Sequence, residues 1–229
     1  MKKIAILQSN YIPWKGYIDM INSVDEFIFY DHAQYTKNDW RNRNLVKTKQ
    51  GIKWLTIPVR QLKLDQPISD TKIVDKKWAK KHWKTISQNY SKTKYFKEYR
   101  NIFEELYLNC TEEYLNQINY KFITAINLIL GITTKIRFSS EFDLIEGKTA
   151  RLLALCKDCN ADTYLSGPAA KVYLDQDLAK KENISIEWMD YSGYSEYSQL
   201  HPPFVHGVSI LDLIFNEGPK ATKYMRSFK

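Results

Sequence analysis

Residues 3–30, KIAILQSNYIPWKGYIDMINSVDEFIFY, decide the fold of this chain. The run from Lys3 to Leu7 is short, apolar and rich in isoleucine, which is typical of a buried strand. A polar turn follows, residues 17–23 have the pattern of a helix, and residues 25–30 have that of a second strand. A strand, a helix and a strand within about 30 residues predict a βαβ unit and a parallel sheet.

Further elements extend this pattern along the chain. Helical periodicity dominates the middle, where Trp78 opens a stripe that recurs every four residues and Gly131 ends the last helix. We therefore predict an α/β fold: a Rossmann-like, mostly parallel sheet with a helical insertion over 72–130, within one domain of residues 1–229. The other expected elements are strands at 54–59 (broken by Pro58), 161–165 and 184–189, and helices at 147–157 and 208–215.

Charge is distributed unevenly along the chain. The 229 residues carry 34 Lys and Arg against 26 Asp and Glu, a net charge of +8, and 44% of them are hydrophobic. Residues 1–100 hold 21 of the basic and 9 of the acidic residues, a net of +12, whereas residues 101–229 have a net of −4. A basic half of this kind indicates a polyanionic partner, either nucleic acid or a phosphorylated small molecule.

Several classes of protein and site are excluded by the sequence. No apolar run approaches the length of a transmembrane helix, and the first apolar run is too short for a signal peptide, so we expect a cytoplasmic protein without membrane insertion. Cys156 and Cys159 lie in a helical pattern without further ligands nearby, so we expect buried thiols and no metal site. The 8 glycines form neither GxGxxG nor a Walker A loop, so side chains, helix ends or another turn must hold any phosphate.

Two polar segments follow the first two strands, at the sheet edge where parallel α/β proteins bind ligands. Residues 8–17 offer amides, rings that can stack and a lysine; residues 31–44 offer a carboxylate, an imidazole, amides and cations that can bind phosphate. The alternatives are a packed turn for the first segment and a solvated loop for the second. In an extended chain the asparagines of the second segment would lie on one face and the arginines on the other. The candidate site residues are Gln8, Asn10, Trp14, Lys15, Tyr17, Asp31, His32, Lys37, Arg41, Asn42, Arg43 and Asn44.

Two later residues complete the set of candidates. His82 lies on the apolar side of the predicted central helix, where it is either a buried structural histidine or a general base, because an ordinary pKa near 6.5 suits that role. The lysines from Lys76 to Lys84 lie on the opposite side, and we expect a solvated helix face. Ser166 follows the strand predicted at 161–165 and again indicates the ligand-binding edge.

A series of ordered motifs runs nearly end to end along the chain. The motifs are Gln8 with Pro13-Trp14-Lys15-Gly16-Tyr17, Asp25 to Asp31 with Gln34-Tyr35, Asn42-Arg43-Asn44, Trp54 to Pro58, His82-Trp83, Tyr164 to Gly167 with Tyr173-Leu174, Ser209 to Asp212, and Asn216 to Pro219. In these residues the chain resembles the WbqC-like protein family of bacterial surface-polysaccharide gene clusters. The resemblance implies tailoring of amino sugars in O-antigen or capsule assembly, by placing an acyl or aminoacyl group on a sugar amine.

The turn after the first strand has a second, weaker similarity, to the nucleotidyltransferase-like Rossmann group. In that group an HxGH motif contacts ATP phosphates. Residues 14–17 of this chain read Trp-Lys-Gly-Tyr, so both histidines are missing, and no KMSKS-like loop is present. The similarity therefore supports the fold and argues against adenylylation.

These observations predict a transferase that acts on a nucleotide-linked amino sugar. A neutral sugar amine would attack an activated acyl or aminoacyl donor, carried by acyl-CoA or aminoacyl-tRNA, with a base to accept the amine proton. The alternatives are an RNA-binding protein that uses aminoacyl-tRNA and a non-catalytic scaffold of the polysaccharide pathway. The expected roles are Asp31, His32 or His82 as the base, Lys15, Arg41 and Arg43 on the diphosphate, Gln8, Asn42, Asn44 and Ser166 on polar groups, and Trp14 or Tyr17 for stacking.

Overall fold

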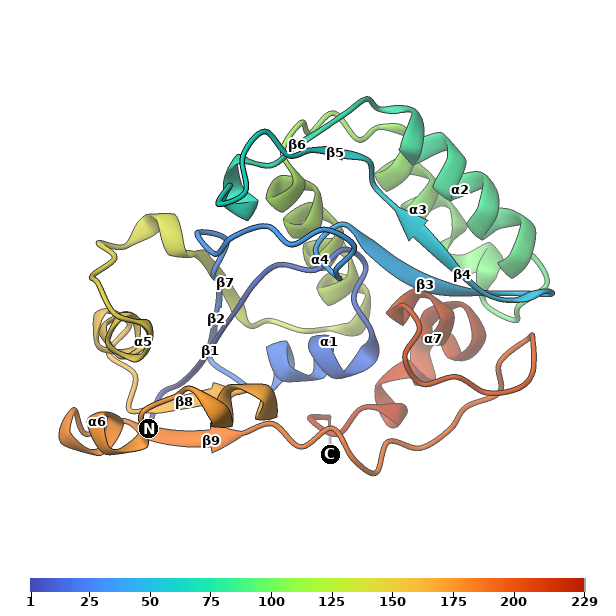
Figure 1. Cartoon of the computed structure of the whole chain (residues 1–229). Helices are drawn as coiled ribbons and strands as arrows, with labels where there is room; N and C mark the ends of the chain where they lie inside the picture. The colour runs from blue at the N-terminus through green and yellow to red at the C-terminus, as the bar shows by residue number, and fades with distance from the viewer. Residues whose placement is uncertain (229) are drawn as a thin grey trace.

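A five-stranded parallel sheet organises one side of the molecule (Figure 1). The computed structural model describes residues 1–228. The strand order is β7-β2-β1-β8-β9, and every neighbouring pair is parallel, which is the doubly wound order of a Rossmann-like sheet. This confirms the predicted fold class. The strands are β1 (Lys3–Leu7), β2 (Glu26–Phe29), β7 (Lys135–Phe138), β8 (Thr163–Ser166) and β9 (Ser185–Trp188).

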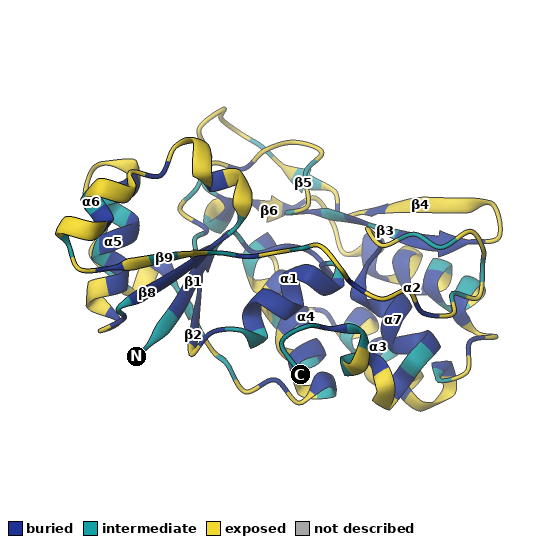
Figure 2. Cartoon of the chain, turned by 90° about the horizontal axis from the view of Figure 1, so that it is seen from below, coloured by how far each residue is buried: buried dark blue, intermediate teal, exposed yellow. Residues whose placement is uncertain are grey.

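Different helices cover the two faces of this sheet (Figures 1 and 2). Side chains alternate along a strand, so Ile4 and Ile6 pack on one face and Phe27 and Phe29 on the other. The first face lies against α5 and α6, and the second lies against α1 and the helical insertion. The covering helices are α1 (Lys15–Asn22), α5 (Lys148–Asp158) and α6 (Gln176–Lys181).

The helical insertion lies where the sequence predicts it, although the division of residues 1–229 into one domain stays a prediction. The Trp78 stripe of its first helix is buried, while the lysines from Lys76 to Lys84 are exposed, which confirms the solvated face. Gly131 ends the last helix in the left-handed region, at φ 73°, where a residue without Cβ fits best. The helices are α2 (Lys77–Tyr90), α3 (Phe96–Leu108) and α4 (Leu115–Leu130), and α7 (Ile210–Glu217) packs against α3.

Short antiparallel ribbons connect the sheet to the insertion. The strand predicted at 54–59 is wrong in its limits, because the observed strand begins at Gly51 and ends at Thr56. Pro58, which has no N–H to donate, separates it from the next strand. Figure 2 shows β4 exposed along the outside of its ribbon. Asn42 and Asn44 are buried and Arg41 and Arg43 are not, as the alternation predicts. The ribbon strands are β3 (Arg43–Thr48), β4 (Gly51–Thr56), β5 (Val59–Arg60) and β6 (Lys72–Ile73).

Three further observations concern the cysteines, metal sites and membrane-spanning helices considered in the sequence analysis. Cys110, Cys156 and Cys159 are buried free thiols. Within residues 1–228, no three His, Cys, Asp or Glu side chains come together as the ligands of a metal would. None of the helices in this part of the chain combines the length and the apolar character that crossing a bilayer requires.

Candidate functional site

The carboxyl ends of β1 and β8 meet at the point where the sheet reverses its strand order. From β1 the chain leaves toward α1 and β2 on one side, and β8 lies on the other side. In doubly wound sheets the crevice outside such a switch point is the usual ligand site. Gln8 follows β1 there, and Tyr30 follows β2.

A cavity of about 330 Å³ occupies this position, and we call it the switch-point pocket. The N-terminus of α5 forms one wall, because Gly147 and Lys148 line the cavity. Gly147 precedes the helix at φ 93°, and no side chain caps the helix, so the first-turn N–H groups are left for a ligand. The lining residues are Ile6, Leu7, Gln8, Tyr30, Glu146, Gly147, Lys148, Arg151, Leu152, Tyr164 and Tyr173.

Two cations belong to this pocket. Arg151 is held in place, since it donates to the Tyr30 hydroxyl at 3.0 Å and to the Ile145 carbonyl oxygen at 2.6 Å. Lys148 is exposed, and among residues 1–228 no carboxylate lies within ion-pair distance of it, whereas the exposed Glu146, which also lines the pocket, lies 3.8 Å from Arg151. A fixed guanidinium, a free ammonium and an uncapped helix N-terminus together favour an anionic group such as a phosphate.

A buried polar cluster lies beside the pocket, around Ser9. Its backbone N–H donates to Asp31 Oδ1 at 2.9 Å, and its hydroxyl accepts from Asn119 Nδ2 at 3.0 Å. Asn119 also donates to the Arg41 carbonyl oxygen, which ties α4 to the loop after β2. Asp31 Oδ2 and Asn119 Oδ1 are both buried without a hydrogen-bond partner. Buried acceptors are rarely left in this state, so each requires a bound donor or a functional reason.

Asp31 has a perturbed protonation equilibrium. Burial raises the pKa of its carboxyl group to about 6, against the lowering effect of the Ser9 hydrogen bonds and of the Arg41 charge. Desolvation disfavours the carboxylate, and one N–H and one nearby guanidinium offset only part of that loss. A carboxylate with this pKa is mostly ionised at neutral pH and is a better base than an ordinary aspartate.

A second cavity, of about 320 Å³, lies on the other side of Ser9, and we call it the tryptophan pocket. Its walls are largely apolar because the Trp14 and Trp40 rings provide much of the surface. Gly16 makes room for the Trp14 indole, since a Cβ at Gly16 would lie 2.3 Å from that ring. Ile12 in the same turn adopts φ 35°, a strained value for a β-branched residue. The lining residues are Asn10, Pro13, Trp14, Trp40, Asn44, His206 and Gly207.

The sequence-predicted residues divide between these places. Gln8 lines the switch-point pocket, while Asn10, Trp14 and Asn44 line the tryptophan pocket. Asp31 and Arg41 line neither pocket, but Asp31 accepts from the Ser9 N–H and Arg41 donates to Asn10. The Tyr17 hydroxyl donates to the Gln8 carbonyl oxygen at 2.9 Å and so holds the segment after β1 in position.

The other predicted residues line neither pocket. Asn42 donates to the Ile57 carbonyl oxygen, and Arg43 stacks on the Trp54 ring with its guanidinium carbon 4.0 Å from the ring centre. Ser166 is buried against the Tyr164 hydroxyl, Lys37 is exposed, and His32 contacts the Ser139 hydroxyl at 2.9 Å.

Lys15 lines neither pocket and lies in a box of aromatic rings, although its charge, after burial, helps to lower the pKa of His206 in the tryptophan pocket. Its ammonium donates to the Ser195 carbonyl oxygen at 3.0 Å and lies 5.1 Å from the ring centre of Tyr194 and 5.3 Å from that of Tyr197. Burial lowers the pKa of Lys15 to about 8, although Asp19 and Glu196 act in the opposite direction. In this position the residue attaches α1 to the C-terminal segment of the chain.

His82 is buried, and both of its ring nitrogens have partners. Nε2 lies 3.2 Å from the Thr56 carbonyl oxygen, which can only accept, so this nitrogen carries the proton. Nδ1 then accepts from the Tyr11 hydroxyl at 2.9 Å. Burial lowers the pKa of His82 to about 4, with a further contribution from the charge of Lys53. His82 is therefore neutral near pH 7 and is part of the packing between α2 and the segment after β1.

Sequence reasoning missed most of the switch-point pocket. Lys148 and Arg151 lie on a helix that the sequence does predict, but β7, the strand before it, was not predicted. Had the run Lys135–Phe138 been recognised as a strand, α5 would have been the crossover helix after it, and its N-terminus would have been placed at the ligand edge. Trp40 and His206 had no comparable signal.

Comparison with known proteins identifies the family. The WbqC-like protein family matches residues 8–224, which include the segment after β1, Asp31, and the lysine and arginine of α5. The chain belongs to the WbqC-like protein family. A relative in Mycobacterium tuberculosis (strain ATCC 25618 / H37Rv), the uncharacterized protein Rv1507c, is 46% identical over 227 residues, which cover 99% of this chain and 98% of the relative. No solved structure matches this WbqC-like chain.

Proposed function

We propose that this WbqC-like protein is a transferase that places an acyl or aminoacyl group on the amine of a nucleotide-linked sugar, in the assembly of O-antigen or capsule. The observation that carries the proposal is the switch-point pocket, where Lys148, Arg151 and the uncapped N-terminus of α5 surround one cavity. A diphosphate fits this combination, because two cations and free N–H groups neutralise its charge and satisfy its oxygens.

Asp31 is the base in this proposal. It is bonded to Ser9, the residue between Gln8 in one pocket and Asn10 in the other, and its Oδ2 has no partner. Both residues are buried, so the proposal requires the segment around Ser9 to open when substrate binds, after which the amine supplies the hydrogen bond that this oxygen lacks. His82 takes no part, since both its nitrogens are engaged.

The reaction is an acyl substitution. The neutral amine nitrogen forms a bond to the acyl carbon, and the bond between that carbon and the leaving group of the donor breaks. The amine proton passes to Asp31 and from there to the leaving group, which leaves as a thiol or an alcohol. A base positioned in this way contributes a factor of about 10² to 10⁴ in rate.

The first test is binding of a uridine or deoxythymidine diphosphate amino sugar, measured by calorimetry. We expect Lys148→Ala to weaken binding about tenfold, as the loss of a charge-assisted hydrogen bond does. Lys80→Ala, which removes an exposed lysine of α2, is the matched control and leaves the affinity unchanged. Absence of binding to every such nucleotide sugar, or equal binding by both variants, would overturn the proposal.

The second test follows the chemistry with an acyl thioester and the bound nucleotide sugar. Amide formation is expected to increase with pH through about 6, the pKa of Asp31. Asp31→Asn is expected to abolish amide formation while it keeps nucleotide-sugar binding. An Asp31→Asn protein that forms amide at the normal rate would exclude Asp31 as the base.

A further inference from the structure

The tryptophan pocket has a chemistry different from that of the switch-point pocket. None of the seven residues that line it is a lysine, arginine, aspartate or glutamate, and two indole rings and a proline supply its walls. A diphosphate would have no cation among the lining residues, since Arg41 contacts the pocket only through its hydrogen bond to Asn10. The occupant must instead be a group that is largely apolar.

The hydrogen bonds of the lining narrow the choice further. The Asn44 Oδ1 accepts from the Leu45 N–H at 2.8 Å, and its Nδ2 donates to the Tyr11 carbonyl oxygen at 3.0 Å. The Asn10 Oδ1 accepts from Arg41. Within residues 1–228, each amide oxygen of the pocket thus already accepts one hydrogen bond, whereas both Asn10 Nδ2 hydrogens and one Asn44 Nδ2 hydrogen are free to donate, and the His206 ring is the other polar lining group.

This inventory favours an acyl group over a sugar ring, because a ring has several hydroxyl groups and few acceptors of the lining are wholly free. Each sugar hydroxyl carries a hydrogen that needs an acceptor, and burying it without one is unfavourable. An acyl carbonyl oxygen only accepts, and the Asn10 Nδ2 can donate to it. The remaining carbons of an acyl chain need no hydrogen bonds and gain from contact with the indoles.

The position of the pocket fits the same assignment. Gln8 lines the switch-point pocket and Asn10 lines the tryptophan pocket, so at most about 7 Å of extended chain separates them. Ser9, whose N–H donates to Asp31 Oδ1, is the residue between them in sequence, and both Ser9 and Asp31 are buried and line neither pocket. An acyl group in one pocket and a nucleotide sugar in the other would therefore lie against the same short segment, with Asp31 hydrogen-bonded beneath it.

We infer that the tryptophan pocket binds the apolar acyl group of the donor and selects it by size. This rests on the proposed function for the identity of the donor, but the binding of acyl groups is measured separately. The probes are thioesters of N-acetylcysteamine with acetyl, butyryl and hexanoyl groups, titrated while tryptophan fluorescence is recorded.

The expected result is a graded affinity. Each added CH₂ that enters the pocket increases binding about fourfold until the pocket is full. Gly207→Leu fills the cavity, because a Cβ at Gly207 meets nothing within 4 Å and its backbone is not in the glycine-only region. We expect this variant to bind all three thioesters with the same weak affinity, at least tenfold below hexanoyl binding by the unchanged protein.

A tryptophan away from the pocket provides the comparison, because Trp54 packs against Trp40 with the ring centres 5.3 Å apart. Trp40 lines the pocket, whereas Trp188 of β9 is also partly exposed and does not line it. Trp40→Ala should weaken hexanoyl binding and Trp188→Ala should not. Three results would overturn the inference. The affinity would be independent of acyl-chain length, the two tryptophan variants would have equal effects, or methyl glycosides would bind to the unchanged protein and lose this binding in Gly207→Leu.

The two proposals can fail independently. Gly207→Leu should leave nucleotide-sugar binding unchanged, since Gly207 is outside the switch-point pocket. Thioester binding without nucleotide-sugar binding would overturn the proposed function and support the acyl pocket. Nucleotide-sugar binding without thioester binding would overturn the acyl pocket alone.

Discussion

Asp31 is destabilising to the fold at neutral pH, which is unusual for a residue kept only for structure. Its folded-state pKa, about 6, lies above its ordinary value of 3.8, so the native protein binds more protons than the unfolded chain between these values. The contribution of Asp31 to the stability of the protein is therefore fully present below pH 4 and is lost as the pH rises through about 6. We expect Asp31→Asn to raise the free energy of unfolding by about 2–3 kcal/mol at pH 8 and by little at pH 4, measured by urea unfolding.

Asp212 is the matched control for this prediction. It is equally buried, and burial raises its pKa as well, but unlike Asp31 both of its oxygens have partners: they accept from the Tyr90 hydroxyl at 2.9 Å and the Tyr197 hydroxyl at 2.8 Å. Asparagine has an amide nitrogen in place of one of these oxygens, and that nitrogen cannot accept a hydrogen bond. Asp212→Asn therefore loses one of the two tyrosine hydrogen bonds and should lower stability. If Asp31→Asn were also destabilising at pH 8, the carboxylate would be structural and its proposed catalytic role would lose this support.

His82 has the opposite dependence on pH. Its folded-state pKa, about 4, lies below its ordinary value of 6.5, so stability is present above pH 6.5 and is lost as pH falls through 4. The loss amounts to about 3 kcal/mol and is offset in part by the gain from Asp31. We expect acidification from pH 7 to 4 to destabilise Asp31→Asn more than the unchanged protein. A double variant that adds His82→Gln should remove this extra acid sensitivity, and its persistence would point to another buried group.

At the scale of the element, the N-terminus of α5 depends on one glycine. Gly147 adopts φ 93°, where a residue with a Cβ is strained by about 1 kcal/mol, and a Cβ there would also lie 3.4 Å from the Ala150 Cβ. Relief of this strain would tilt the first-turn N–H groups away from the switch-point pocket. We expect Gly147→Ala to lower the melting temperature by a few degrees and to weaken nucleotide-sugar binding severalfold.

Gly131 separates these two effects. It ends α4 at φ 73° with nothing within 4 Å of its absent Cβ, so Gly131→Ala introduces comparable backbone strain outside both pockets. This variant should lose stability and keep its nucleotide-sugar affinity. If both glycine variants weakened binding alike, the effect of Gly147→Ala would be one of general destabilisation.

An element could be predicted from the sequence when the residues that determine it are close together in the chain. The βαβ unit of residues 3–30 was predictable because apolar runs and a turn lie side by side in sequence, and Asn10 and Trp14 followed from their place after β1. β7 has four residues, two of them charged, which is too little for a periodic signal, so α5 could not be placed at the ligand edge. Lys15 was expected to bind phosphate, but its aromatic box comes from residues about 180 positions later in the chain.

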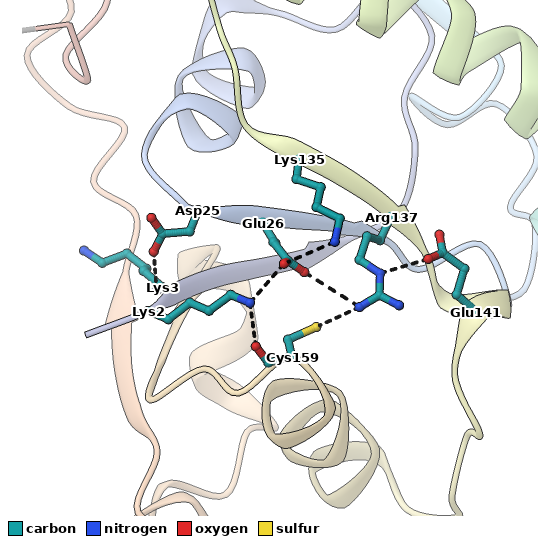
Figure 3. Close-up of polar contacts among 8 residues, drawn as sticks. All are labelled: Lys2, Lys3, Asp25, Glu26, Lys135, Arg137, Glu141 and Cys159. Atoms are coloured by element: carbon teal, nitrogen blue, oxygen red, sulfur yellow. Dashed lines mark hydrogen bonds and ion pairs between the residues drawn. The ribbon is translucent and has the colours of Figure 1, made fainter.

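For the whole molecule, the two edges of the sheet have different tasks. Among residues 1–228, Asp31 Oδ2 at the carboxyl edge has no hydrogen bond and Lys148 there has no ion pair, whereas at the amino edge a network of ion pairs joins the charges, including Glu26, whose Oε2 accepts no hydrogen bond but lies near Arg137 (Figure 3). At the centre of this network Glu26 is 2.9 Å from the ammonium of Lys2 and 3.8 Å from the guanidinium of Arg137. Lys135, on the neighbouring strand, lies 3.6 Å away. A network that joins the starts of three strands stabilises the sheet without presenting free charge to a ligand.

Glu26→Gln tests this division between the edges. Burial alone would raise the pKa of Glu26, but the hydrogen bond and charge of Lys2, with the charge of Lys135, lower it below its ordinary value of 4.5. Its stabilising effect is therefore present above pH 4.5 and is lost as pH falls through the folded-state pKa. We expect Glu26→Gln to lose about 1–2 kcal/mol of stability at pH 7, a difference that vanishes in acid, and to keep its nucleotide-sugar affinity. Glu187→Gln, which breaks the exposed pair with Lys3, should change stability by less than about 0.5 kcal/mol.

Lys148→Ala should show the converse pattern, weaker ligand binding with unchanged stability, because no described partner is lost. A Glu26→Gln protein that binds the nucleotide sugar more weakly while still fully folded would mean that the two edges are coupled through the strands between them.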